Sequence, residues 1–201
     1  MTDILLTGFG PFGGSGINPS GETVGVLDGS EVKGRRIAGV VLPVSWSRSH
    51  LELYRAIADV KPRVIMCLGQ SSRESIALER VAINCCEGSD NDGVERSGSP
   101  AVSGGPDGLF SRLPLEELRS ALDDEGIPAR ISNSAGTYLC NYVMYRLLHG
   151  LEETDDPSTV AGFVHVPSLP QQAAASAGRG RPSMSQDLIN RAVVVMLTVL
   201  F

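Results

Sequence analysis

The sequence has little of what nucleic-acid-binding and membrane-spanning proteins need. Its 23 acidic residues outnumber its 17 basic ones, and the formal net charge is −6. This balance argues against a nucleic-acid partner, because proteins that bind nucleic acids normally present a basic face. No apolar run approaches the ~20 residues that cross a bilayer, and residues 193–201 are apolar but too short. We therefore expect no nucleic-acid partner and no membrane partner.

Signals for export and for metal binding are scarce as well. The N-terminal stretch MTDILLTGF has no basic segment and no small-residue cleavage site, which favours a cytoplasmic protein. The cysteines stand at positions 67, 85, 86 and 140 and form no C-x-x-C pair. In a reducing compartment we expect them to be thiols, each of which either fills the core or serves in catalysis.

The chain is long enough for one hydrophobic core, with 201 residues of which 42% are hydrophobic. We expect residues 1–201 to form a single domain. Candidate strands alternate with candidate helices, which favours an α/β fold, a three-layer α/β/α sandwich around a mostly parallel, mixed sheet. Strands are predicted at residues 4–7, 35–44, 64–69, 76–83, 129–132 and 162–167. Helices are predicted at 20–28, 46–59, 114–125, 137–149 and 184–201, and mostly loop at 88–112 and 172–182.

A glycine-rich loop, TGFGPFGG, follows the first predicted strand. Three of its glycines have the spacing of the dinucleotide-binding pattern G-x-G-x-x-G, namely Gly8, Gly10 and Gly13. In that pattern a helix begins directly after the loop, whereas residues 15–19 delay the first helix here. Phe9 and Phe12 would also obstruct a close approach of phosphates. Taken alone, the loop either packs its phenylalanines in the core or presents aromatic faces to a flat, neutral ligand.

A cysteine, a histidine and a glutamate are candidates for nucleophilic chemistry. Cys140 lies near the start of a predicted helix, where the positive end of the helix dipole favours a thiolate. His165 lies at the end of the predicted strand GFVHVP and could act as its base. Glu79 shares strand parity with Val81 and could orient the imidazole. The alternatives are a buried structural cysteine, a core histidine with satisfied hydrogen bonds, and an ion pair of Glu79 with Arg80 or another surface base.

Several stretches together resemble the pyroglutamyl-peptidase I family of thiol exopeptidases. The matching segments are ILLTGFGPFGG with NPS at residues 4–20, LPV at 42–44, ERVAIN at 79–84, GIPARISNSAGTYLCNYVMY at 126–145, GFVHVPSLPQQ at 162–172 and PSMS at 182–185. They occur in the family's order over nearly the whole chain, and the cysteine-containing segment is highly specific.

The resemblance implies a triad in which Cys140 is the nucleophile, His165 the base and Glu79 the acid. It also implies a compact α/β fold, a homo-oligomer that is frequently a tetramer, and no metal or other cofactor. The implied substrates are peptides with an N-terminal pyroglutamate (5-oxoproline), a flat and uncharged lactam. Phe9 and Phe12 match positions that sandwich the lactam ring, and Gln70 matches a position that contacts the lactam group.

One segment departs from the family's pattern. Residues 84–93, NCCEGSDNDG, are about two residues short and lack an arginine that family members carry near the active site. Arg96 is the nearest replacement, but its register differs. The alternatives to a thiol exopeptidase are a non-catalytic or weakly active relative that binds pyroglutamyl ends, and a nucleotide-binding or nucleoside-processing α/β protein built on the glycine loop.

Overall fold

A computed structural model of the chain describes residues 2–154, 157–175 and 180–201. Among these residues, seven strands form one mixed sheet. From one edge to the other the strands are β10 (Ala129–Ser132), β5 (Ile76–Glu79), β11 (Val160–Val166), β4 (Val64–Gln70), β1 (Thr2–Phe9), β3 (Arg35–Leu42) and β2 (Glu31–Val32). Neighbouring strands are parallel except where β5 meets β11 and where β2 meets β3. The predicted mostly parallel, mixed sheet is confirmed.

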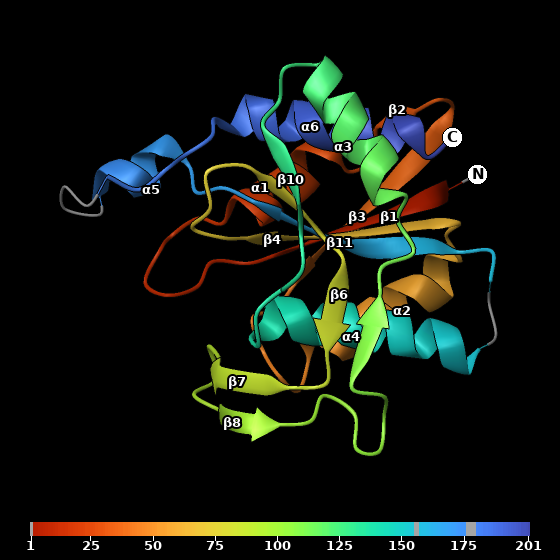
Figure 1. Cartoon of the computed structure of the whole chain (residues 1–201), viewed down its shortest axis with the longest axis vertical. Coiled ribbons are helices and arrows are strands. Elements are labelled where there is room, and N and C mark those ends of the chain that lie inside the picture. Colours follow the sequence, from red (N-terminus) through yellow and green to blue (C-terminus); the bar gives the residue numbers. More distant parts are fainter. Residues whose placement is uncertain (1, 155–156, 176–179) are drawn as a thin grey trace.

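Helices cover both faces of the sheet (Figure 1). One layer contains α1 (Pro19–Leu27), α3 (Leu115–Asp124) and α6 (Gln186–Val199), and the other contains α2 (Ser49–Val60) and α4 (Leu139–Glu153). Capping fixes where α1 and α6 begin, because the Asn18 side chain accepts from the Ser20 N–H and the Ser185 side chain accepts from the Leu188 N–H. None of the helices in the described ranges is long and apolar enough to span a bilayer.

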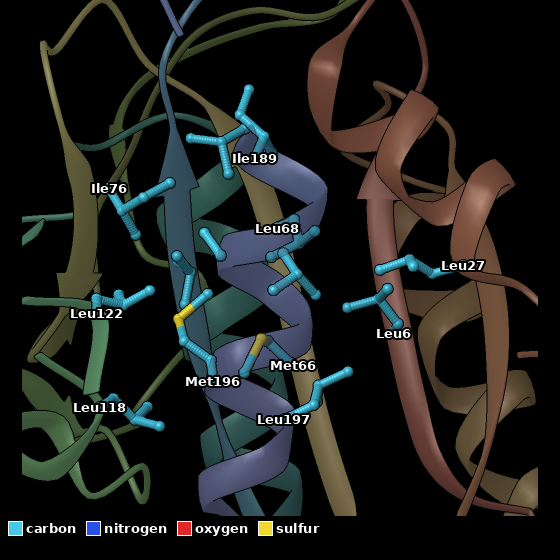
Figure 2. Packing of buried hydrophobic residues seen from close by; sticks show 14 of the residues in the cluster. Leu6, Leu27, Met66, Leu68, Ile76, Leu118, Leu122, Ile189, Met196 and Leu197 are labelled. Carbon is cyan, nitrogen blue, oxygen red and sulfur yellow. The ribbon is translucent and has the colours of Figure 1, made fainter. Parts of the chain in front are cut away.

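Strand β4 shows how the sequence builds two cores. Its residues are buried on both faces of the sheet, as expected for a central parallel strand. Met66 and Leu68 face the layer of α6, together with Met196 of that helix (Figure 2). Ile65 and Cys67 face the layer of α2 and α4. Because alternate residues of a strand point to opposite faces, the residues with the parity of Cys67 face α4.

The predicted loop over residues 88–112 is wrong in part. The segment contains most of a hairpin of β7 (Cys86–Ser89) and β8 (Glu95–Ser99), followed by β9 (Gly108–Phe110). The Asp90 carboxylate accepts from the N–H groups of Asp92 and Val94 and so builds the hairpin turn. A composition rich in Gly, Ser and Asp concealed these strands, because backbone pairing and turn contacts hold them rather than an apolar pattern.

Two further boundaries differ from the sequence-based expectation. The strand predicted over 76–83 divides at Arg80, and its second part, β6 (Val81–Ile83), leaves the main sheet to pair with β9. The predicted loop at 172–182 is helical at its start, within α5 (Pro170–Ala175), and residues 176–179 of it lie outside the described residues. Helix α5 extends away from the body of the molecule (Figure 1).

Candidate active site

Strand pairing places the candidate histidine and glutamate together. Strands β11 and β5 are antiparallel, with Phe163 opposite Glu79 and His165 opposite Ala77. His165 and Glu79 therefore share one face of the sheet and are diagonal neighbours. That face is the one covered by α4, because Phe163 belongs to the core beneath α4. The Nδ1 atom of His165 lies 2.7 Å from Oε1 of Glu79.

Cys140, the candidate nucleophile, approaches His165 from helix α4, which covers this face of the sheet. Cys140 is the second residue of α4, so its expected position near a helix start is confirmed. The Cys140 thiol and the His165 imidazole line the same cavity and are close enough for the sulfur to act on the pKa of the imidazole. Asn141, fully buried, holds this end of α4 against the main chain of β6, with Oδ1 accepting from the Ile83 N–H and Nδ2 donating to the Ile83 and Cys85 carbonyls.

A glycine makes the approach of sulfur and imidazole possible. Gly69 of β4 pairs with His165 in the sheet and has the parity that faces α4. A Cβ atom built on Gly69 would lie 2.8 Å from the Cys140 sulfur and 2.7 Å from the Phe163 ring. Real Cβ contacts are never that short, so only glycine lets the sulfur lie over β4 beside His165.

Electrostatics in this group favour a protonated imidazole. His165 is 5% exposed, and burial alone would lower the pKa of its side chain. The negative Cys140 sulfur and the Glu79 carboxylate outweigh burial and raise the pKa of His165 to about 9. By contrast, burial raises the pKa of the Cys67 thiol to about 12, so this cysteine fills the core as a neutral thiol.

Glu79 has a second partner that sequence analysis missed. Arg73 Nη1 lies 2.9 Å from Oε1 of Glu79, so the carboxylate accepts from both Arg73 and His165. The expected alternative of an ion pair is therefore present beside the His165 contact, but its base is Arg73 and not Arg80, whose guanidinium lies 4.0 Å from Glu116 on the surface. Arg73 lies in the loop between β4 and β5, six residues before Glu79. Its spacing gave no signal, because the contact depends on how that loop folds back.

The cavity beside Cys140 has a volume of about 150 Å³. An apolar cavity of this volume holds a benzene-sized ring. The described residues around it include no Asp, Glu, Lys or Arg, and much of its wall is apolar. It is lined by Phe9, Phe12, Asn18, Val44, Gln70, Ala135, Tyr138, Leu139, Cys140 and His165. All the site residues predicted from the sequence except Glu79 line this one cavity, and Glu79 lies behind His165.

A larger cavity of about 500 Å³ adjoins the first, with Phe12 and Gln70 lining both. The Gln70 amide is held between them by Ser168 and Gln172, with Nε2 donating to Ser168 Oγ at 3.0 Å and to Gln172 Oε1 at 3.2 Å. Gln172 in turn donates to Ser15 of the glycine loop. Gln172 lies within the matching segment GFVHVPSLPQQ, but nothing in the sequence indicated its contact with Gln70.

The glycine loop serves two purposes, since Gly8 lets strand β1 pack on helix α1 and Phe9 and Phe12 line the cavity beside Cys140. A Cβ on Gly8 would lie 2.3 Å from the Ser20 carbonyl oxygen, so this glycine lets β1 pack closely on α1. Phe9 is buried, whereas Phe12 is half-buried at the cavity wall. Helix α1 begins only at Pro19, well after the glycines, so the loop lacks the helix start of a dinucleotide-binding motif.

Arg96, the nearest replacement for the missing family arginine, does not line the cavity beside Cys140. Its guanidinium packs over the rings of Trp46 and Tyr142, at 5.1 and 5.3 Å from the ring centroids. The contact holds hairpin β7–β8 against α4. Among the described residues, no three His, Cys, Asp or Glu side chains are grouped so that they could hold a metal ion.

Known proteins resemble this chain over its whole length. The family model described as pyroglutamyl peptidase matches residues 2–201. A pyrrolidone-carboxylate peptidase of Klebsiella pneumoniae is 43% identical, with 99% of this chain and 92% of the relative aligned. One of Pyrococcus furiosus is 39% identical, with 98% and 96% aligned.

Solved structures agree with these relatives. A mutant pyrrolidone carboxyl peptidase from the hyperthermophile Pyrococcus furiosus superposes with a TM-score of 0.94 at 39% identity, covering 98% of this chain and 97% of that one. The pyrrolidone carboxyl peptidase of Thermococcus litoralis gives the same TM-score at 36% identity, covering 99% and 93%. The fold of the chain is that of these peptidases.

Proposed function

The chain belongs to the pyroglutamyl peptidase family, and we propose that Cys140, His165 and Glu79 are the triad with which it works. It is a cysteine peptidase, and so a hydrolase, that removes an N-terminal pyroglutamyl residue from peptides. The observation that carries the proposed triad is that the Cys140 sulfur and the His165 imidazole line one cavity while the Glu79 carboxylate contacts the imidazole from behind.

The lactam ring is assigned to the 150 Å³ cavity. Its size suits a five-membered ring, and a wall without carboxylates suits a group that has no amine and no charge. We assign Phe9 and Phe12 to the faces of the ring and Gln70 to the lactam amide. The peptide beyond the scissile bond then has room in the adjoining cavity of about 500 Å³, between the glycine loop and Gln172.

The chemistry begins from an ion pair of the Cys140 thiolate and the protonated His165 imidazole, which forms when the thiol gives its proton to His165 before substrate binds. The thiolate attacks the pyroglutamyl carbonyl carbon, and the carbonyl oxygen becomes an oxyanion. We assign its stabilisation to backbone N–H groups at the start of α4, including that of Cys140, since the N-cap residue Tyr138 makes no side-chain cap there. Each such donor contributes about 3 kcal/mol to stabilising the transition state.

The carbon–nitrogen bond then breaks, and His165 gives its proton to the departing amine. A thioester joins the pyroglutamyl group to Cys140. His165, now neutral, takes a proton from a water molecule that attacks the thioester carbonyl. Pyroglutamate leaves, and Cys140 is again a thiolate beside the protonated His165. Glu79 stabilises the imidazolium in both halves of the reaction and holds the ring in place.

Release of a fluorescent amine from its pyroglutamyl amide tests the proposal. The reduced wild-type protein should release the amine from the pyroglutamyl amide and should leave the prolyl amide intact. Treatment with iodoacetamide should abolish this release. Cys140→Ser should lose at least about 1000-fold in rate. Cys85→Ser is the matched control, because Cys85 is partly exposed and does not line the cavity. A folded wild-type protein that releases no amine, with Cys140 no more reactive than Cys85, would refute the mechanism.

We further propose a single domain over residues 1–201, a cytoplasmic location and a homo-oligomer, a tetramer by the family resemblance. The thiols support the location, because all the cysteines, Cys140 among them, are free within the described structure and a reducing compartment preserves them. An exposed apolar face supports the oligomer. Phe110 is 71% exposed and Ile83 38% exposed, both on the β6–β9 pair.

A further inference from the structure

Glu79 is in an environment that a lone carboxylate would not tolerate as an anion. Its side chain is completely buried, and its Oε2 atom has no hydrogen-bond partner among the described residues. All its polar contacts there therefore fall on Oε1, which accepts from His165 and from Arg73. Removing a carboxylate from water is unfavourable unless charged partners compensate. When His165 is neutral, Arg73 is the cationic partner in contact with this carboxylate.

Arg73 also contacts the segment that leads into the nucleophile's helix. Nη1 donates to Ser132 Oγ at 2.7 Å, and Nη2 donates to the Ser134 carbonyl oxygen at 2.9 Å. Ser132 is the last residue of β10 and pairs with Glu79 in the sheet. Ser134 lies five residues before the first residue of α4. One guanidinium thus joins the triad's acid to the chain that carries Cys140.

We propose that Arg73 is a positioning residue for this reaction, which keeps the Glu79 carboxylate directed at His165 and fixes the segment at residues 132–134 before α4. The inference rests on the proposed triad and adds to it. Arg73 acts through Glu79 and through the main chain, and it is not among the residues that line the substrate cavity.

The planar guanidinium is suited to this role. Its two terminal nitrogens point at different acceptors, the Glu79 carboxylate and the Ser134 carbonyl, which the single nitrogen of a lysine cannot reach together. Its side chain is 27% exposed, so bulk water screens it more than it screens Glu79. The charged or titratable groups that act on Glu79 are Arg73 from the β4–β5 loop, His165 from β11, and Cys140 from α4 through His165. Arg80 is directed to Glu116 instead.

The pH dependence of kcat/KM separates positioning from a merely structural role. In Arg73→Gln the Glu79 carboxylate is no longer held toward His165, so His165 loses the contact by which Glu79 raises its pKa. We expect the basic limb of kcat/KM for the pyroglutamyl amide to move to lower pH by about 1 unit and the rate at pH 7 to fall roughly 10-fold or more. Arg73→Lys can hold the carboxylate but not the Ser134 carbonyl as well, so the basic limb should return toward that of the wild type while kcat stays reduced.

Arg80→Gln is the matched control, because it removes a neighbouring arginine that does not contact Glu79, and its profile should equal the wild-type profile. A lower rate in Arg73→Gln with an unmoved basic limb, or no change at all, would overturn the inference. An inactive wild-type protein would instead refute the proposed triad, so the two failures are distinguishable.

Discussion

His165 lies between two groups of negative charge, the Cys140 sulfur and the Glu79 carboxylate, and this is the residue-scale feature that sets the chemistry. Its pKa of about 9 keeps the imidazole protonated at neutral pH despite burial. A protonated imidazole is ready to donate to a leaving amine, and its charge stabilises the thiolate beside it. Loss of that proton at high pH should therefore reduce the rate.

We expect kcat/KM for the pyroglutamyl amide to fall as the pH rises through about 9, because His165 becomes neutral there. Since Glu79 raises the pKa of His165, Glu79→Gln should move this basic limb to lower pH by about 1 unit. Initial rates between pH 5 and about 10.5 measure both profiles. Glu116→Gln, on the exposed side of α3, should leave the limb in place. A basic limb that does not respond to Glu79→Gln would contradict the assignment.

Phe12 is the aromatic side chain shared by the two cavities, and it is half-buried in the absence of substrate. Phe12→Ala should raise KM for the pyroglutamyl amide about 10-fold with a smaller change in kcat, because it removes apolar contact made before and during the reaction. Steady-state kinetics measure the effect. Phe201→Ala at the far end of the chain is the control. An unchanged KM in Phe12→Ala would exclude Phe12 from ring binding.

At the scale of elements, the contact between β4 and α4 depends on the absence of a side chain at Gly69. Gly69→Ala should lower kcat at least about 10-fold, because its Cβ displaces the Cys140 sulfur from His165. Fluorescent amine release measures kcat, and circular dichroism confirms that the variant is folded. Gly25→Ala in α1 is the control, since a Cβ there meets no atom within 4 Å, and it should preserve activity. A wild-type kcat in Gly69→Ala would contradict this prediction, because it would show that a Cβ at residue 69 does not displace the Cys140 sulfur.

Sequence predicted the elements that carry a buried apolar pattern, and it missed those held by polar contacts. The continuous apolar run of β4 and the stripe of α4 gave clear signals, and both elements exist close to where they were expected. Hairpin β7–β8 and helix α5 lack such a pattern. The hairpin is fixed by the Asp90 turn and by Arg96 over Trp46, which are contacts that only the folded chain brings together.

The same division holds for the candidate site. Cys140, His165 and Glu79 could be named as candidates from their residue types at a helix start and in strands, and the family resemblance implied that they act as a triad. Arg73 and Gln172 could not, because their roles arise from loops that fold back onto Glu79 and Gln70. Gly69 gave no signal either, since its function is the space it leaves for a sulfur atom from another layer.

At the scale of the whole molecule, the exposed face of β6 and β9 is the proposed contact between copies of the chain. Phe110→Glu should shift sedimentation-velocity profiles toward smaller species, because a charge opposes burial of this face. Val26→Glu on α1, at a residue 61% exposed, is the matched control and should leave the species distribution unchanged. If the Phe110 variant keeps the wild-type distribution, the contact lies elsewhere.

The two ends of the described chain lie together at one side of the molecule (Figure 1). Arg35 connects them, with its guanidinium 3.1 Å from the Asp3 carboxylate and packed over the Phe201 ring. The cavity beside Cys140 opens at the opposite ends of β1, β4 and β11, where Phe9, Gln70 and His165 lie. An affinity tag or a solid support attached at either terminus should therefore leave the entrance unobstructed, so the protein can be immobilised by its ends and still admit peptides.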